Sequence, residues 1–175
     1  PYPANYGGVI DVFYKMKALI DKGFKIHLHC FEYGREHSEV LERLCFSVNY
    51  YRRLTNLNKV FQKSPYIACS RESDELVKNL EKDNYPILLE GLHSCSILNR
   101  LSLDGRRVFV RTHNVEHEYY RSLAKTEKNL RKKIYLLQES SKLEKFESIL
   151  NKAWSFLMES DAFSFHTIKS ILNVQ

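Results

Sequence analysis

The sequence predicts an α/β fold in which a parallel β-sheet is flanked by helices. Short apolar or alternating segments that suit β-strands alternate along the chain with amphipathic segments of helical spacing. In addition, a Gly7-Gly8 pair precedes the first helical segment, as in the strand-to-helix loop of a doubly wound sheet. The 175 residues, 43% hydrophobic and 27% charged, suit a globular chain that buries its own core. We therefore expect a single domain over residues 1–175.

The first half of the chain predicts two helices and two strands. Val9, Phe13 and Met16 recur at the spacing of one helix face, and Gly23 supplies a stop behind them. Residues 24–31 alternate between apolar and polar side chains, which is the period of a strand. In order, we expect a helix over residues 9–21, a strand over 24–31, a short helix over 39–44 and a strand over 46–51.

The second half continues the alternation of strands and helices. Ser73, Asn129 and Ser160 are suitable N-cap residues for three of the helices. In order, we expect a helix over residues 73–83, a strand over 86–91, a short helix over 95–103, a strand over 106–111, helices from 116 and over 129–152, a strand over 153–158 and a helix over 160–172.

The first eight residues resemble a loop that follows a strand, because they are rich in Pro and Gly. The last residues carry no terminating signal. We therefore expect a fragment of a Rossmann-like parallel sheet that lacks its first strand.

A cluster of polar residues follows the strand over 106–111. Ligands of open α/β sheets bind outside the carboxyl ends of the strands, so this position indicates a site. His93 follows the strand over 86–91 and suits the same crevice, although a surface-loop histidine is an open alternative. The polar cluster after residue 111 contains four candidate site residues: His113, Asn114, Glu116 and His117.

Two motifs have structural alternatives. The H-x-x-E-H spacing of residues 113–117 matches inverted zinc peptidases. That chemistry needs both histidines on one helix face, whereas His113 lies against a strand end, so we expect no metal. The alternative is a histidine and an asparagine that hold a turn together.

Gly7 and Gly8 would let a phosphate approach the amides at a helix N-terminus, and their alternative is a tight turn.

Charge and cysteine content limit the partners. The net charge of +6 favours an anionic partner. The basic helical region over 125–145 suits an anionic membrane surface or, as the alternative, a solvated helix packed on the sheet. No nucleic-acid-binding motif is present, so we expect no nucleic acid. The four scattered cysteines suit reduced thiols in a core. We expect a cytoplasmic protein, with peripheral binding to the inner membrane face left open.

Four segments of the chain form a recognisable set: Pro3-Ala4-Asn5-Tyr6-Gly7-Gly8 before a helix, Arg111-Thr112-His113-Asn114-Val115-Glu116-His117 after a strand, Phe146-Glu147 near the end of a long Tyr- and Lys-rich helix, and Ser160-Asp161. Together these segments resemble bacterial family-four glycosyltransferases. The resemblance implies a GT-B fold, in which two Rossmann-like domains face a cleft, and sugar transfer with retention of configuration. It also implies that this chain is the N-terminal, acceptor-side domain, without the C-terminal donor domain, and that no metal or other cofactor is needed.

The resemblance also implies roles for individual residues. Gly7 and Gly8 would form the loop for the donor diphosphate, and His113 would be the catalytic residue that touches the transferred sugar. The partners would be a nucleotide-sugar and a glycan or lipid-linked acceptor of surface polysaccharide synthesis. We expect the 175 residues alone to be inactive, and a non-catalytic Rossmann-like binding or regulatory domain is the alternative. The acceptor side would comprise Asn5, Tyr6, His93, Asn114, Glu116 and His117.

Overall fold

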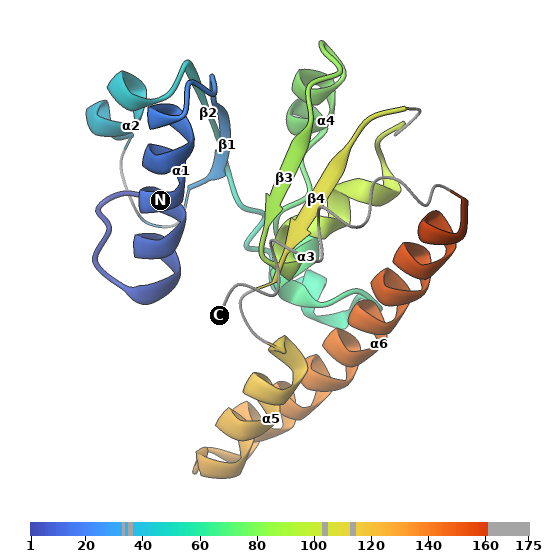
Figure 1. The fold of residues 1–175 in the computed structure, drawn as a ribbon. Helices are drawn as coiled ribbons and strands as arrows, with labels where there is room; N and C mark the ends of the chain where they lie inside the picture. Colours follow the sequence, from blue (N-terminus) through green and yellow to red (C-terminus); the bar gives the residue numbers. More distant parts are fainter. Residues whose placement is uncertain (33, 35–36, 103–104, 113–114, 161–175) are drawn as a thin grey trace.

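The computed structural model describes residues 1–160 apart from 33, 35–36, 103–104 and 113–114, and for residues 57, 149 and 151–160 it describes only the backbone. The described chain alternates helices with short strands, which confirms the α/β class (Figure 1). In order the elements are α1 (Gly7–Asp21), β1 (His27–Phe31), α2 (Glu39–Leu44), β2 (Ser47–Tyr51), η1 (Leu57–Phe61), α3 (Tyr66–Cys69), α4 (Asp74–Leu80), β3 (Ile87–Glu90), η2 (Leu92–Asn99), β4 (Val108–Arg111), α5 (Glu116–Thr126) and α6 (Leu130–Ser160).

The four described strands form two parallel pairs rather than one continuous sheet. β1 pairs with β2, with His27 opposite Ser47, and β3 pairs with β4, with Ile87 opposite Val108. Helices on both sides join the pairs: α1 contacts β1 and the ends of β3 and β4, and α4 packs on β3 while its Asn79 bonds to β2. The parallel direction was predicted, but the single sheet was not found among the described strands.

Two clusters of buried hydrophobic side chains correspond to the two strand pairs. Met16 of α1 packs with Leu41 and Cys45 over β1 and β2. The larger cluster surrounds β3. It contains Tyr51, Leu76, Leu80, Ile87, Leu89, Cys95, Ile97 and Leu101. Because Tyr51 belongs to β2, the larger cluster also ties the two strand pairs together.

Two of the predicted helix starts are confirmed by their capping bonds. The Ser73 hydroxyl accepts a hydrogen bond from the amide of Leu76 at 3.2 Å, and the Asn129 side-chain oxygen accepts one from the amide of Lys132 at 3.2 Å. Each side chain satisfies an amide that the first turn of a helix leaves without an intrahelical partner.

Two elements differ from the prediction. Residues 153–158 are helical, because α6 continues to Ser160 and no Gly or Pro interrupts it. A short apolar run suits a buried strand and a buried helix equally, so its pattern could not distinguish them. The expected helix over 95–103 is the 3₁₀ helix η2, which begins at Leu92. The helix expected over 160–172 lies outside the described residues, except for Ser160, which ends α6.

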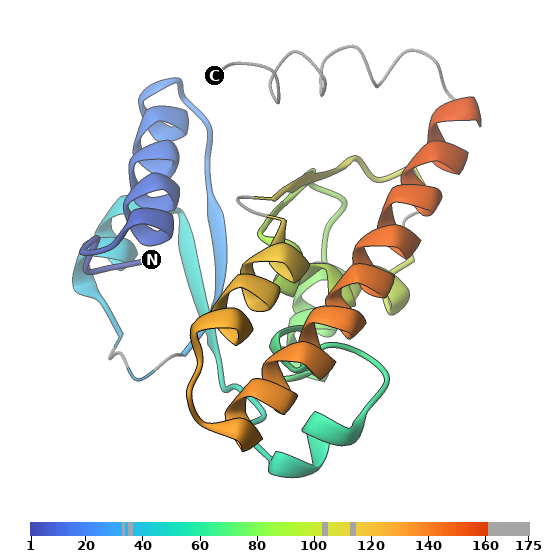
Figure 2. The same ribbon diagram turned by 90° about the horizontal axis from the view of Figure 1, so that it is seen from below.

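α5 and α6 form an antiparallel helical hairpin that extends beyond the carboxyl ends of β3 and β4 (Figures 1 and 2). Its attachment to the rest of the chain is both apolar and polar. Phe146 and Leu150 of α6 pack against the larger buried cluster. Buried Glu139 of α6 accepts a hydrogen bond from the Tyr66 amide at 2.6 Å and one from Lys142 at 2.7 Å. The Lys142 ammonium in turn donates to the Val60 carbonyl at 2.6 Å, which holds α6 against η1 and α3.

Candidate functional site

An ion cluster fixes the first half of α1 at the carboxyl ends of β3 and β4. The Arg111 guanidinium at the end of β4 binds the Asp11 carboxylate, and the Lys15 ammonium lies 2.5 Å from Glu90 at the end of β3. Arg111 also lies 3.7 Å from Glu90. Its hydrogen bond to Asp11 is the largest cause that raises the pKa of Arg111. No pattern in the sequence predicted this cluster, because it joins residues far apart in the chain.

Gly7 and Gly8 lie at the start of α1, one turn before Asp11, and so at the same rim as the end of β4. Both are exposed, and a Cβ added to either would meet no atom within 4 Å. The surrounding fold therefore does not require glycine at these positions. The N-cap residue Tyr6 makes no side-chain capping bond, and the first turn of α1 carries no acidic residue, so α1 itself does not neutralise the positive end of its dipole.

His113 and Asn114 lie outside the described residues. Their neighbours are placed: Arg111 ends β4 and Glu116 begins α5. The assigned catalytic role of His113 therefore stays a prediction, while the segment that carries it begins at the rim where α1 starts.

The two remaining residues of the motif lie at the base of the hairpin. The His117 ring places its Nδ1 2.5 Å from the Glu147 carboxylate, and the His117 amide donates to the same carboxylate at 3.3 Å. The His117 carbonyl accepts a hydrogen bond from the Ser140 hydroxyl at 2.8 Å. These contacts orient the first turn of α5 on α6. Burial, followed by the charge of Glu147, raises the pKa of Glu116.

His93 also lies at this rim, directly after β3. Its ring packs on the backbone of Gly91, whose φ of +84° suits glycine. A Cβ at position 91 would lie 2.5 Å from Cε1 of His93. The predicted pair Asn5 and Tyr6 is exposed just before α1. The structure thus places Asn5, Tyr6, Gly7, Gly8 and His93 at the carboxyl ends of the strands.

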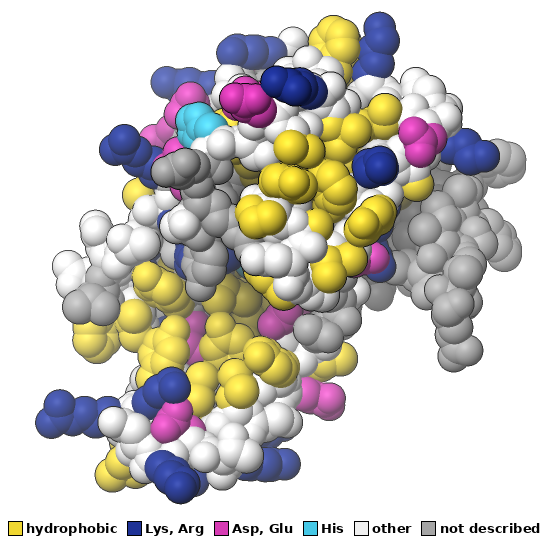
Figure 3. All heavy atoms as spheres, turned by 90° about the vertical axis from the view of Figure 1, so that its left-hand side faces the viewer, with side chains coloured by type: hydrophobic (Ala, Val, Ile, Leu, Met, Phe, Trp, Pro, Cys, Tyr) yellow, Lys and Arg dark blue, Asp and Glu magenta, His cyan; other side chains and the backbone are white. Residues whose placement is uncertain are grey.

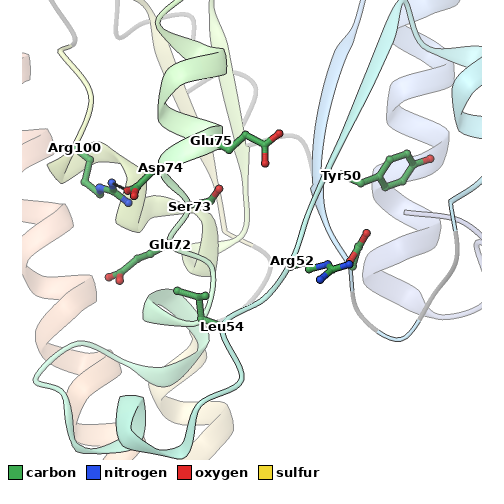
Figure 4. Close-up of a pocket in the computed structure, with 9 residues that line it drawn as sticks. Tyr50, Arg52, Leu54, Glu72, Ser73, Asp74, Glu75 and Arg100 are labelled. Carbon is green, nitrogen blue, oxygen red and sulfur yellow. Dashed lines mark hydrogen bonds and ion pairs between the residues drawn. The ribbon is translucent and has the colours of Figure 1, made fainter.

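A cleft that the sequence did not predict opens at the carboxyl ends of β1 and β2, with a volume of about 780 Å³ (Figure 4). Glu32 follows β1 and Arg52 follows β2, and the opposite wall comes from the start of α4. In the part of the chain that the structure describes, Arg52 and Glu75 make no hydrogen bond or ion pair. The lining residues are Glu32, Tyr50, Arg52, Leu54, Glu72, Ser73, Asp74, Glu75 and Arg100.

The charge of the cleft limits its ligands. Four carboxylates face two guanidinium groups, so the wall is net negative and disfavours a phosphate. Asp74 pairs with Arg100, and Glu72 pairs with Lys59 at 3.0 Å. Carboxylate acceptors beside a guanidinium donor suit the hydroxyl groups of a neutral carbohydrate. The weak sequence pattern over residues 33–62 gave no signal for this cleft.

The described residues hold no group of three or more His, Cys, Asp or Glu side chains placed to bind a metal ion. None of the helices in the described ranges is both long and apolar enough to cross a bilayer. All four cysteines are unpaired thiols, and three of them are buried. Burial raises the pKa of each one, to about 11 for Cys30 and about 12 for Cys95.

One similar protein was found by comparison with curated sequences. Over 146 residues the chain is 32% identical to an "Uncharacterized 44.6 kDa protein in cps region" of Klebsiella pneumoniae. The match covers 79% of this chain and 37% of that protein, so the chain spans little more than a third of its relative. No protein-family description and no solved structure matches the chain.

Proposed function

We propose that this chain is the acceptor-side domain of a retaining glycosyltransferase that builds a surface polysaccharide. The observation that carries the proposal is the position of α1: its Gly7-Gly8 end lies at the carboxyl rim where the segment with His113 begins. The relative from a cps region, a capsule polysaccharide region, supports a role in polysaccharide synthesis.

The first turn of α1 suits the diphosphate of a nucleotide-sugar. Backbone amides at a helix N-terminus attract phosphate oxygens, and two glycines let those oxygens approach closely. The absence of an acidic residue in this turn preserves that attraction. During retaining transfer, negative charge develops on the leaving phosphate, and preorganised amides would stabilise it. His113 would orient a hydroxyl group of the transferred sugar rather than move a proton.

The cleft beside β1 and β2 suits the acceptor. Arg52 and Glu75, which have no polar partner among the described residues, offer a donor and an acceptor to sugar hydroxyls, while Leu54 adds apolar surface. The net negative wall would repel a nucleotide and so separate the two ligands. Donor and acceptor would then occupy different parts of one carboxyl edge.

Among the described strands, β1 and β3 each pair with a neighbour on one side only, so a further parallel strand would fit between the two pairs, as in a Rossmann-like sheet. In the longer protein, a second domain would supply most of the nucleotide contacts. For that reason we expect the 175 residues to transfer no sugar by themselves.

The test uses the longer protein with labelled nucleotide-sugars and the glycan acceptor of the producing strain. Gly8→Ala is the informative variant. Alanine favours the helix by about 1 kcal/mol over glycine, and its Cβ meets nothing in the fold, so thermal stability should hold or rise. The same Cβ would obstruct the diphosphate, so the KM for donor should rise at least tenfold.

Lys17→Ala, an exposed substitution in the same helix, is the matched control and should leave the KM unchanged. His113→Ala should lower kcat by at least a hundredfold. Unaltered donor kinetics in Gly8→Ala, or full activity in His113→Ala, would refute the proposed site. A longer protein without any transfer activity would favour the non-catalytic binding domain instead.

A further inference from the structure

One segment of the α5–α6 hairpin is strongly basic, although the hairpin over residues 116–160 carries nine basic and seven acidic residues in all. Residues 119–137 carry six basic residues and one acidic residue, a net charge of +5, whereas the whole chain carries +6. These residues span all of α5 except its first three residues, the connecting turn and the first two turns of α6. We call this segment the hairpin tip. Its basic residues are Arg121, Lys125, Lys128, Arg131, Lys132 and Lys133.

The hairpin tip also exposes large apolar side chains. Leu130, Ile134 and Leu137 are 70%, 48% and 47% exposed and recur at the spacing of one face of α6. On α5, Tyr119 and Leu123 are 51% and 38% exposed at positions four residues apart. Figure 3 shows hydrophobic side chains bordered by Lys and Arg on the lower part of the molecule, where the hairpin lies.

These exposed side chains do not belong to the face of α6 that packs on the rest of the chain. A different face of α6 is already packed, because Leu136, Glu139, Ser140 and Leu143 are buried. Glu139 and Lys142 fix that face to the rest of the chain. The apolar stripe of Leu130, Ile134 and Leu137 therefore remains exposed although another face of α6 is packed against the rest of the chain.

We propose that the hairpin tip docks on an anionic lipid bilayer. Leucine and isoleucine would enter the interface between headgroups and acyl chains, and the flanking lysines and arginines would contact lipid phosphates. A second copy of the chain is disfavoured as the occupant, because two tips of charge +5 repel each other. A nucleic acid would use the cations but would leave the Leu–Ile stripe exposed to water.

Vesicle flotation of the full chain tests the proposal. Binding is expected to vesicles of phosphatidylcholine mixed with phosphatidylglycerol, but not to phosphatidylcholine alone, and high salt should weaken it. Each cation near an anionic surface contributes roughly fivefold in affinity, so Lys128→Gln with Arg131→Gln should weaken binding roughly 25-fold. Leu130→Ser with Ile134→Ser should also abolish flotation, while circular dichroism and thermal unfolding remain unchanged because both side chains are exposed.

Lys17→Gln with Lys22→Gln is the matched control, since it removes two exposed cations from α1 and its end. This control should float like the unmodified chain. Equal binding to both vesicle types, an equal loss in the control, or full binding by the Leu130–Ile134 variant would overturn the proposal. If the unmodified chain dimerises with increasing concentration and the Leu130→Ser, Ile134→Ser variant does not, the stripe is a contact between two copies and the membrane proposal is wrong.

Discussion

Replacing Gly91 with alanine should destabilise the protein through two separate effects at the candidate site. The backbone of Gly91 has φ +84° and ψ 151°, a region that costs other residues on the order of 1–3 kcal/mol. In addition, the new Cβ would lie 2.5 Å from Cε1 of His93, so the imidazole must leave its rotamer at a cost of about 0.5–1.5 kcal/mol. The total of about 2–4 kcal/mol corresponds to a Tm lowered by roughly 5–15 °C in a chain of this size.

Thermal and urea unfolding of Gly91→Ala measure that total, and two further variants separate its parts. Gly23→Ala also places alanine at a positive φ, +88°, but its Cβ would meet no atom within 4 Å. It should cost only about 1–2 kcal/mol. In a His93→Ala background, Gly91→Ala should cost about 1 kcal/mol less than in the unmodified chain.

The result that would refute this reasoning is a Gly91→Ala cost no greater than that of Gly23→Ala and unchanged by His93→Ala. It would mean that the His93 ring does not rest on Gly91, and it would remove His93 from the position described at the carboxyl rim.

Three further predictions concern buried polar groups. Burial lowers the pKa of His29, whose Nδ1 lies 2.7 Å from the Tyr51 hydroxyl, so the unfolded state binds the proton more readily than the folded state. The stability of the fold should therefore be fully present above about pH 6.5 and should fall as the pH drops below that value. Urea unfolding of His29→Gln should lack this part of the pH dependence. Glu139→Ala should lower the free energy of unfolding by about 3–5 kcal/mol, because it removes the buried carboxylate that binds the Lys142 ammonium and the Tyr66 amide. Urea unfolding measures this change, and an equal loss in Glu144→Ala, at an exposed position, would contradict the reasoning. Burial raises the pKa of all four thiols, to about 12 for Cys95. A chromogenic disulfide reagent should therefore modify the thiols of the native protein far more slowly than those of the urea-unfolded chain. Rapid modification of all four thiols in the native state would show that the core is wrongly described.

Local signals in the sequence were sufficient for most elements of the fold. The N-caps Ser73 and Asn129, the apolar spacing of α1 and the buried run of β3 each act within a few neighbouring residues, so their patterns identify helices and strands directly. The same local logic placed Gly7, Gly8 and His93 beside strand ends. It failed for residues 153–158, since a short apolar run carries no local feature that separates a strand from the end of a long helix.

Only the tertiary structure decided which strand ends share a rim and what surrounds them. The bonds from Arg111 to Asp11 and from Lys15 to Glu90 join positions 100 and 75 residues apart, and no periodicity reports such a pairing. The cleft at Arg52 and the division into two strand pairs have the same origin, because both depend on how separate elements pack. The sequence by itself determined the types of element, their order and the excess of positive charge, since these follow from neighbouring residues and from composition. Packing determined where the charges, the glycines and the exposed stripe of α6 meet one another.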